Sequence, residues 1–231
     1  MNKKNNKLNF QFIGIWGSGK SSIINQINTT LEIKGLSVFK ETEYFTKNKY
    51  FYLRLIFKLF LFKPIYFFKI LFYLIRFYII LKPKHKVEYD IYKILAKSIL
   101  IRNELDKPQL HNISLSEGIY HLLPVFKNMK NLKEIDFLFL DSIVKKQKTY
   151  FIFIEINPSD AYRRVVEDNE INNRFSKDEL LNLKKRYEIM IKNQKLIKNN
   201  LSENNIIILN GNKSIAENSF FLSKIIFNMI N

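Results

Sequence analysis

Short apolar segments alternate with longer amphipathic stretches along most of the chain. The apolar segments predict five β-strands, at residues 10–13, 36–40, 113–116, 149–156 and 205–209. The 149–156 segment is apolar almost throughout, which is typical of a parallel strand covered on both faces. The intervening stretches predict helices at 22–34, 88–105, about 132–146, from 158, at 176–201 and from 214. This alternation predicts an α/β fold built on a doubly wound parallel sheet of about five strands.

Several helix ends carry their own signals. Gly35 follows the first predicted helix, and Pro158 stands in the first turn of another, where proline sacrifices no hydrogen bond. Ser176–Glu179 and Ser214–Glu217 each match a capping box. In that motif a serine hydroxyl and a glutamate three residues later satisfy the free N–H groups at a helix start. The last two helices are therefore expected to begin at these motifs.

A basic, aromatic segment between about 44 and 105 breaks the alternation of strands and helices. It holds thirteen Phe or Tyr residues between 50 and 81. Between 44 and 87 it has ten Lys or Arg residues and no Asp or Glu. Helical periodicity returns at 88–105. We therefore expect one domain spanning 1–231, with a helical insertion at about 44–105.

The cations of this insertion fall on narrow helix faces. At about 100° per residue, Arg54 and Lys58 share a face before Pro64, and Lys69 and Arg76 share one after it. No apolar run exceeds six residues, so the segment makes a poor membrane-spanning helix, which needs about 20.

Two interpretations of the insertion stay open. Residues 50–86 could lie on an anionic membrane surface, because bulky apolar faces beside a basic stripe suit such a surface. Alternatively, the apolar faces pack on the domain itself or against a second copy in a homodimer. We do not expect nucleic acid as a partner, because the aromatic residues adjoin aliphatic ones without Gly or polar residues to form a channel.

The composition narrows the chemistry further. The 231 residues include no Cys, which excludes disulfides and thiolate metal sites, and the net charge of +17 favours anionic partners. The three histidines, His85, His111 and His121, show no ligand spacing and are expected to be ordinary surface or core residues. The first nine residues are polar and lack the features of a signal peptide. We therefore expect a cytoplasmic protein, peripheral on the inner face of the membrane if its aromatic helices bind lipid.

One motif points directly to chemistry. Residues 14–21 read Gly-Ile-Trp-Gly-Ser-Gly-Lys-Ser, a complete G-x-x-x-x-G-K-[ST] phosphate-binding loop between a predicted strand and a predicted helix. There, backbone N–H groups and the positive end of a helix dipole point at one spot. Lys20 would reach the β- and γ-phosphates of ATP, Ser21 would bind Mg²⁺, and Gly19 would allow close approach. The predicted nucleotide-binding residues are Gly14, Trp16, Gly17, Ser18, Gly19, Lys20, Ser21 and Ser22.

Beyond this loop, the order of motifs resembles the thymidylate kinase and deoxynucleoside kinase group of P-loop kinases. The resemblance covers most of the chain outside 44–105. It rests on Phe12–Ser22, Ile156–Pro158 with Arg164, Arg174-Phe175, Arg186-Tyr187 and Asn210-Gly211.

The resemblance implies that Arg164 and Arg174 belong to a lid that closes over the transferring phosphate. Mobile arginines would stabilise its charge and exclude water. Together with Arg163 they flank a polar stretch, 167–173, that we predict to be a mobile loop. The alternative, in which these arginines only solvate a helix surface, stays open.

The chain departs from the thymidylate kinases at one informative place. It has Ser116-Glu117-Gly118 where they carry Asp-Arg-Tyr or Asp-Arg-His, whose arginine holds the acceptor phosphate. Nucleoside kinases of the group likewise place a glutamate in this region. The missing arginine favours an acceptor hydroxyl, whose proton Glu117 could take as a general base. Glu117 could instead bind Mg²⁺ through water, or be a purely structural carboxylate.

The sequence therefore predicts an ATP- and Mg²⁺-dependent small-molecule kinase that phosphorylates a hydroxyl of a nucleoside, sugar or lipid-linked acceptor. The predicted catalytic residues are Lys20, Glu117, Arg164 and Arg174, and the predicted metal contacts are Ser21 and Glu117. Two alternatives remain. One is a thymidylate-type nucleotide kinase whose acceptor-phosphate arginine comes from elsewhere, for example Arg102. The other is a membrane-associated ATPase switch without an acceptor.

Overall fold

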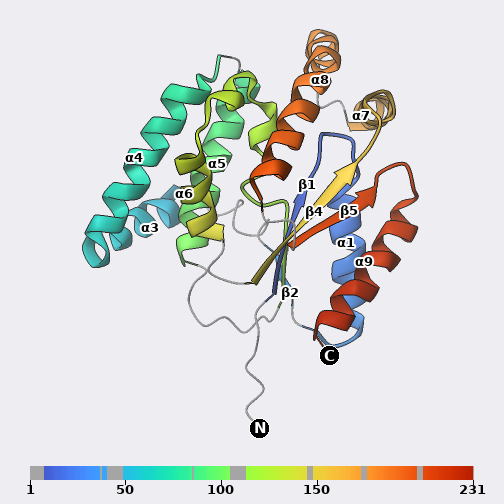
Figure 1. Ribbon diagram of the computed structural model, residues 1–231, viewed down its shortest axis with the longest axis horizontal. Coiled ribbons are helices and arrows are strands. Elements are labelled where there is room, and N and C mark those ends of the chain that lie inside the picture. The colour runs from blue at the N-terminus through green and yellow to red at the C-terminus, as the bar shows by residue number, and fades with distance from the viewer. Residues whose placement is uncertain are drawn as a thin grey trace.

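A five-stranded parallel sheet forms the centre of the molecule (Figure 1). The computed structural model describes residues 8–36, 38–40, 49–84, 86–104, 113–144, 148–172, 176–201 and 205–230. The strands are β1 (Leu8–Ile13), β2 (Val38–Lys40), β3 (Ile113–Ser116), β4 (Lys148–Glu155) and β5 (Ile206–Asn210). They lie in the order β2-β3-β1-β4-β5, and every neighbouring pair is parallel. The predicted fold class is confirmed.

Helices connect the strands and cover both faces of the sheet. They are α1 (Lys20–Ile33), α3 (Lys49–Phe62), α4 (Pro64–Leu81), α5 (Lys86–Glu104), α6 (Glu134–Val144), α7 (Pro158–Asn172), α8 (Lys177–Asn200) and α9 (Ile215–Ile230). Two short 3₁₀ helices, η1 (Leu123–Val125) and η2 (Lys127–Asn131), precede α6. They lie before the helix predicted at about 132–146, which forms as α6 from Glu134.

The side-chain alternation of the strands separates two cores. Phe10 and Phe12 of β1 point to one face, where they pack with residues of α1 and α9. Ile13 points to the other face, where the core continues through α4, α5, α6 and α8. Figure 1 shows α1 and α9 together on one side of the sheet and α3 to α6 on the other. Both faces are thus covered, as the apolar β4 predicted.

Between β2 and β3 the described chain holds three helices, α3, α4 and α5. Pro64 is the first residue of α4, and the chain reverses there, so α3 and α4 form a helical hairpin. By length and composition, α4 alone among the described helices could cross a membrane, with a mean hydropathy of 1.7 over 18 residues. Those two properties do not distinguish a membrane span from an apolar helix of a water-soluble protein.

The structure corrects one part of the predicted basic stripe. Arg76 does not lie on an open basic face beside Lys69. Its guanidinium makes two hydrogen bonds to the buried carboxylate of Asp136, at 2.5 and 3.0 Å, and so ties α4 to α6. Asp136 also accepts a hydrogen bond from the backbone N–H of Lys133 at the start of α6. The helical wheel could not show this pair, because its partner lies 60 residues away.

The predicted mobile loop at 167–173 is also wrong for most of its length. Helix α7 continues to Asn172, so 167–172 is helical. Asn and Asp weaken isolated helices by competing for backbone hydrogen bonds, and that preference misled the prediction. Ion pairs from Arg163 to Asp160 and Glu167, at i,i−3 and i,i+4 spacing, support the helix instead.

Candidate active site

The phosphate-binding loop joins the end of β1 to the start of α1. Gly17 and Gly19 both have positive φ angles, 75° and 86°, which side chains with a Cβ rarely adopt. A Cβ on Gly17 would lie 2.2 Å from the carbonyl oxygen of Ala161 in α7. Gly19 caps α1, whose first turn holds no acidic residue that would compete with an anionic ligand. The loop therefore presents bare backbone at the positive end of a helix dipole.

Lys20 is buried in this loop. Its ammonium donates hydrogen bonds to the carbonyl oxygens of Gly14 and Ile15, both at 3.0 Å. Burial lowers the pKa of Lys20 below that of an ordinary lysine, and the nearby Glu117 carboxylate opposes this effect. A desolvated cation held by two neutral carbonyls gains when an anion reaches it. Lys20 is thus arranged to exchange these carbonyls for phosphate oxygens.

Ser21 and Glu117 meet at the mouth of the loop. The Ser21 hydroxyl donates a hydrogen bond of 2.5 Å to Glu117 Oε1, across 96 residues of sequence. Glu117 directly follows β3, so its carboxylate stands at the carboxyl edge of the sheet, where ligands of parallel sheets bind. This contact brings together the two residues that the sequence predicted as metal contacts.

His121 holds the other side of the same carboxylate. Its Nε2 lies 3.1 Å from Glu117 Oε2, and its Nδ1–H donates to the carbonyl oxygen of Gly118 at 2.9 Å. Burial alone would raise the pKa of Glu117, but His121, Lys20 and the Ser21 hydrogen bond outweigh it and keep that pKa below its ordinary value. Glu117 is therefore ionised at neutral pH, and both of its oxygens are held in place.

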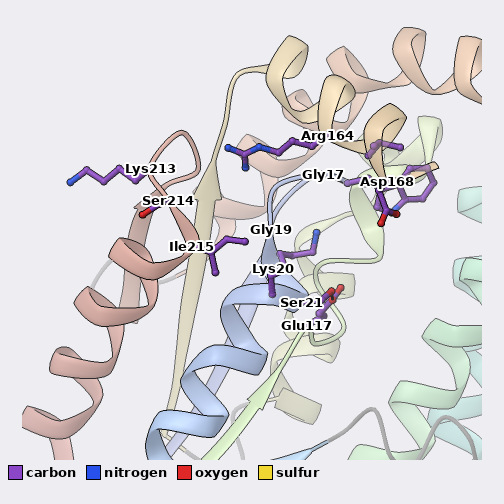
Figure 2. A pocket seen from close by; sticks show the side chains of 13 residues that line it. Gly17, Gly19, Lys20, Ser21, Glu117, Arg164, Asp168, Lys213, Ser214 and Ile215 are labelled. Atoms are coloured by element: carbon purple, nitrogen blue, oxygen red, sulfur yellow. Dashed lines mark hydrogen bonds between the residues drawn. The ribbon is translucent and has the colours of Figure 1, made fainter. Parts of the chain in front are cut away.

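A cavity of about 770 Å³ opens over these groups (Figure 2). Its lining includes the predicted site residues Trp16, Gly17, Gly19, Lys20, Ser21, Ser22, Glu117 and Arg164. Gly14 and Ser18 stand outside the lining that the described residues form, and Gly14 contributes through its carbonyl contact with Lys20. The volume lies within the usual range for small-molecule sites.

The predicted lid arginines fall into three situations. Arg164 projects from α7 and lines the cavity, as Figure 2 shows. Arg163 points elsewhere and pairs with Asp160 and Glu167 of its own helix. Arg174 lies outside the described residues, and so does the side chain of Arg102. Among these arginines, and within the described part of the chain, Arg164 is the one that lines the cavity together with the phosphate-binding loop.

Two neighbouring residues, Arg186 and Tyr187, support the walls of the site from behind. The Tyr187 hydroxyl donates to the carbonyl oxygen of Trp16 at 3.1 Å and so fixes the loop against α8. Arg186 pairs with Glu88 of α5 at 3.3 Å, and Glu88 also accepts the backbone N–H of Lys84. The Arg186-Tyr187 motif therefore positions the loop and braces the insertion, without lining the cavity.

Sequence reasoning missed several lining or supporting residues: His121, Val165, Asp168, Lys213, Ser214 and Ile215. Ser214 was noted only as a helix cap, although it follows β5 at the same edge of the sheet as the loop. His121 was expected to be an ordinary surface or core residue, and the structure places its ring against Glu117. Its i,i+4 spacing from Glu117 was the one signal in the sequence, but residues 118–122 form turns rather than a helix.

The residues present fit a magnesium–nucleotide complex. Mg²⁺ prefers oxygen ligands and usually takes one or two from protein, completing its shell with phosphates and water. Ser21 and Glu117 offer two such oxygens beside the buried Lys20. The bare loop backbone offers N–H donors suited to phosphate. Oxygen ligands suited to Mg²⁺ and N–H donors suited to phosphate thus lie together at one end of the cavity.

Comparison with known proteins supports this fold. No protein-family model matches the chain, and no curated protein matches its sequence. Two structures of deoxyadenosine kinase from M. mycoides, one with bound dCTP and one with bound dATP, align over 95% of this chain and 99% of theirs. Their TM-scores are 0.53 and 0.52, at 16% and 17% sequence identity. A gluconokinase from Sinorhizobium meliloti 1021 aligns over 97% of both chains, with 12% identity and a TM-score of 0.42.

The fold is therefore that of the P-loop kinases. The resemblance to the deoxynucleoside kinase group, drawn from short motifs, is confirmed at the level of the fold.

Proposed function

We propose that this protein is an ATP-dependent small-molecule kinase that transfers the γ-phosphate of ATP to a hydroxyl group, with nucleosides as the first acceptor class to test. The observation that carries the proposal is the convergence of Lys20, Ser21, Glu117 and Arg164 on one cavity. The shared fold with deoxyadenosine kinase, whose structures hold dCTP and dATP, supports a nucleoside acceptor.

Lys20 and Arg164 would carry the electrostatic part of the reaction. When ATP binds, the Lys20 ammonium leaves the carbonyls of Gly14 and Ile15 and contacts the β- and γ-phosphate oxygens. Arg164 approaches from α7 and stabilises the charge that develops on the transferring group. Arg174 remains a proposed second lid arginine. Both arginines would also help to exclude water, which favours transfer over hydrolysis.

For Glu117, the geometry favours a role on the metal side. Ser21, the other predicted metal contact, donates to one of its carboxylate oxygens, so an ion bound beside them would meet two oxygen ligands together, while His121 lies at the other carboxylate oxygen. Its lowered pKa also makes it a weaker base. We therefore propose that Glu117 and Ser21 hold Mg²⁺, directly or through water. When bound, that ion would neutralise charge on the β- and γ-phosphates.

Position 117 supports an acceptor that presents a hydroxyl. The thymidylate kinases carry their acceptor-phosphate arginine there, whereas this chain has Glu117, a carboxylate that would repel an acceptor phosphate. The next residue, Gly118, has a φ of 65°, and a Cβ there would lie 2.2 Å from Oε1 of the buried Gln11. A tyrosine or histidine of the thymidylate kinase type could therefore occupy position 118 only if Gln11 and the backbone moved.

The test is transfer of labelled γ-phosphate from ATP, with Mg²⁺, to a panel of nucleosides, nucleoside monophosphates and sugars. We expect a phosphorylated nucleoside as the main product, dependent on Mg²⁺. Preference for thymidylate over every hydroxyl acceptor would overturn the acceptor class. Release of labelled inorganic phosphate alone, with the whole panel present, would favour the ATPase switch and overturn the proposal. Since ATP is a cytoplasmic substrate, we also propose a cytoplasmic location.

A further inference from the structure

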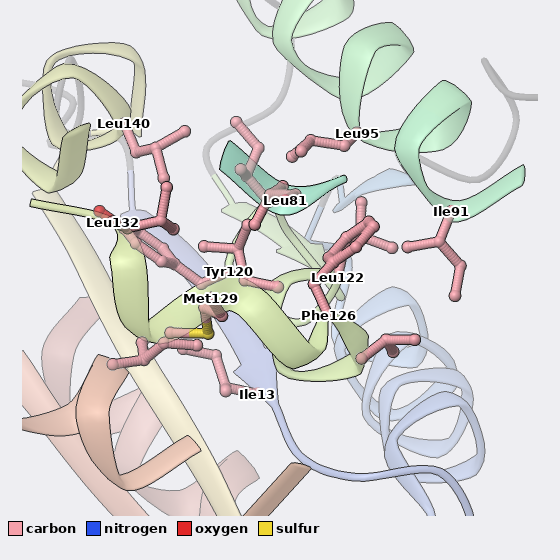
Figure 3. Packing of buried hydrophobic residues seen from close by; sticks show 14 of the residues in the cluster. Ile13, Leu81, Ile91, Leu95, Tyr120, Leu122, Phe126, Met129, Leu132 and Leu140 are labelled. Atoms are coloured by element: carbon pink, nitrogen blue, oxygen red, sulfur yellow. The ribbon is translucent and has the colours of Figure 1, made fainter. Parts of the chain in front are cut away.

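The hairpin of α3 and α4 has an inner face that packs on the protein. Tyr52, Leu55 and Leu59 of α3 and Ile70, Phe77 and Leu81 of α4 are buried. Figure 3 shows Leu81 in the core with Ile91 and Leu95 of α5 and with Leu122 and Phe126. The Arg76–Asp136 pair and the stacked rings of Tyr73 and Phe139, 3.7 Å apart, fix α4 on α6. The hairpin is thus firmly attached to the domain by one face.

The outer face of the same hairpin is exposed and apolar. We call it the hairpin face, and it consists of Tyr50, Leu53, Phe57, Phe60, Leu61, Phe62, Ile65, Phe68, Leu71, Phe72, Ile75, Tyr78 and Ile79. Ile65 is the most exposed of these side chains (88%), and it lies with Phe62 (75%) where the two helices meet. Figure 1 shows α4 as the outermost helix on this side of the molecule. So large an apolar surface marks a contact with a partner or a membrane.

The charges beside this surface have one sign. Neither α3 nor α4 contains an acidic residue, whereas Arg54, Lys63 and Lys69 are exposed along them. Arg54 and Lys58 also border a groove of about 480 Å³ whose other walls are Phe and Leu side chains of α3. A groove with an apolar floor and a cationic rim matches a phospholipid, which has an anionic headgroup on an apolar chain.

The same charges argue against pairing with a second copy. In a two-fold dimer the same patch lies on both subunits, so the basic residues of one hairpin would face those of the other. With no carboxylate on either helix, such an interface would bring like charges together in a partly dry environment. A membrane surface instead supplies the anions that the hairpin lacks.

We propose that the hairpin face docks the protein on an anionic lipid bilayer. Phe62 and Ile65 enter the boundary between headgroups and acyl chains, and Arg54, Lys63 and Lys69 contact lipid phosphates. Arg76 takes no part, because Asp136 holds it. The active-site cavity is lined by other elements, so docking and phosphoryl transfer can be measured separately.

The first test measures co-sedimentation of the full-length protein with vesicles of phosphatidylcholine, with and without phosphatidylserine. We expect much tighter binding with phosphatidylserine than without it, weakening as salt rises. Each basic residue near an anionic surface strengthens binding about fivefold, so Arg54→Gln, Lys63→Gln and Lys69→Gln together should weaken it about 100-fold.

A matched control replaces three exposed lysines of α8, Lys185→Gln, Lys192→Gln and Lys195→Gln, and should bind nearly as the wild type does. Absence of binding at low salt, or equal losses in the two triple variants, would overturn the proposal.

The second test separates insertion from charge attraction. At about 1 M salt the screening length is about 3 Å, so the binding that persists reports apolar insertion. Phe62→Ser with Ile65→Ser should reduce this residual binding at least about tenfold. The control, Phe220→Ser with Ile33→Ser, changes side chains of similar exposure (76% and 80%) on α9 and α1 and should retain it. If light scattering shows a stable dimer that Phe62→Ser with Ile65→Ser converts to monomers, the hairpin face is a subunit interface and the membrane proposal is wrong.

Discussion

At the scale of single residues, the site depends on which partners each charged group has before substrate arrives. Lys20 donates to two carbonyl oxygens, while Glu117 is held from both sides by Ser21 and His121. The phosphate-binding loop could be predicted because its residues are adjacent in sequence and their spacing is itself the signal. The contact between Ser21 and Glu117 could be predicted only from the strand order, because it depends on β1 and β3 being neighbours in the sheet. The contact of His121 could not be predicted, because it depends on a turn that no sequence motif encodes.

Lys20→Ala should lower phosphoryl transfer by at least about 10²–10³-fold, because it removes the cation that stabilises charge on the transferring phosphate. The fold should survive, since alanine favours helix α1 and the substitution removes a buried charge. The measurement is steady-state transfer together with circular dichroism. Lys185→Ala, on the exposed side of α8, is the control. Unchanged turnover in a folded Lys20→Ala protein would exclude the loop from the mechanism.

Glu117→Gln should weaken binding of Mg-ATP about 10–100-fold, because it removes a charged oxygen beside Ser21. Calorimetric titration with ATP, in the presence and absence of Mg²⁺, measures this effect, and Glu188→Gln on α8 is the control. The opposite pattern, lower turnover with unchanged Mg-ATP affinity, would assign Glu117 to proton abstraction and refute its placement at the metal.

At the scale of helices and strands, local sequence motifs predicted the start of a helix correctly. They did not predict contacts between elements that are distant in the sequence. The predicted capping box at Ser214 forms as expected: Glu217 accepts from the Ser214 hydroxyl and backbone N–H, and Ser214 Oγ accepts the Glu217 N–H. By contrast, Arg76 was interpreted from the periodicity of its own helix, and it pairs with a carboxylate on another element, as Arg186 also does. No periodicity within a helix records such a partner.

Ser214→Ala should destabilise the protein by about 1 kcal/mol at neutral pH, because it removes the cap of α9. Hydrogen bonds from the Ser214 hydroxyl and N–H hold the pKa of Glu217 below its ordinary 4.5. A lowered carboxylate pKa stabilises the fold above pH 4.5, and this contribution is lost as the pH falls through the lowered value. The difference between wild type and variant, measured by urea unfolding, should therefore shrink below pH 4.5. Ser142→Ala, which removes only a back-bond to Phe139, should show no such dependence.

Arg76→Met should cost about 3 kcal/mol, because it leaves the buried Asp136 carboxylate without its cation. Adding Asp136→Asn should recover part of that loss, giving a coupling of about 1–3 kcal/mol in a double-mutant cycle. Urea unfolding monitors all four proteins. Lys63→Met, at the exposed junction of α3 and α4, should change stability by no more than about 0.5 kcal/mol. Strictly additive effects would show that the pair does not hold α4 on α6.

At the scale of the whole molecule, the alternation of strands and helices was enough to predict the parallel sheet and its five strands. The continuous apolar run of β4 signalled cover on both faces, and the sheet has it. Packing of the aromatic segment on the domain and an exposed apolar face for a membrane do not exclude each other. Its helices pack on the domain by one face and leave the other exposed, and a helical wheel cannot decide which apolar face finds a partner.

The central claim is that Lys20, Ser21, Glu117 and Arg164 act together to move a phosphoryl group from ATP to an acceptor hydroxyl. The most direct test follows the γ-phosphate label in a time course with Mg²⁺ and the best acceptor from the panel, and measures how it divides between acceptor and water. We expect nearly all label to reach the acceptor, Arg164→Ala to slow transfer by about 10²-fold or more, and ATP still to bind to this variant. Label found only in inorganic phosphate, at a rate that the acceptor and Arg164→Ala leave unchanged, would show that these four residues do not catalyse transfer to an acceptor.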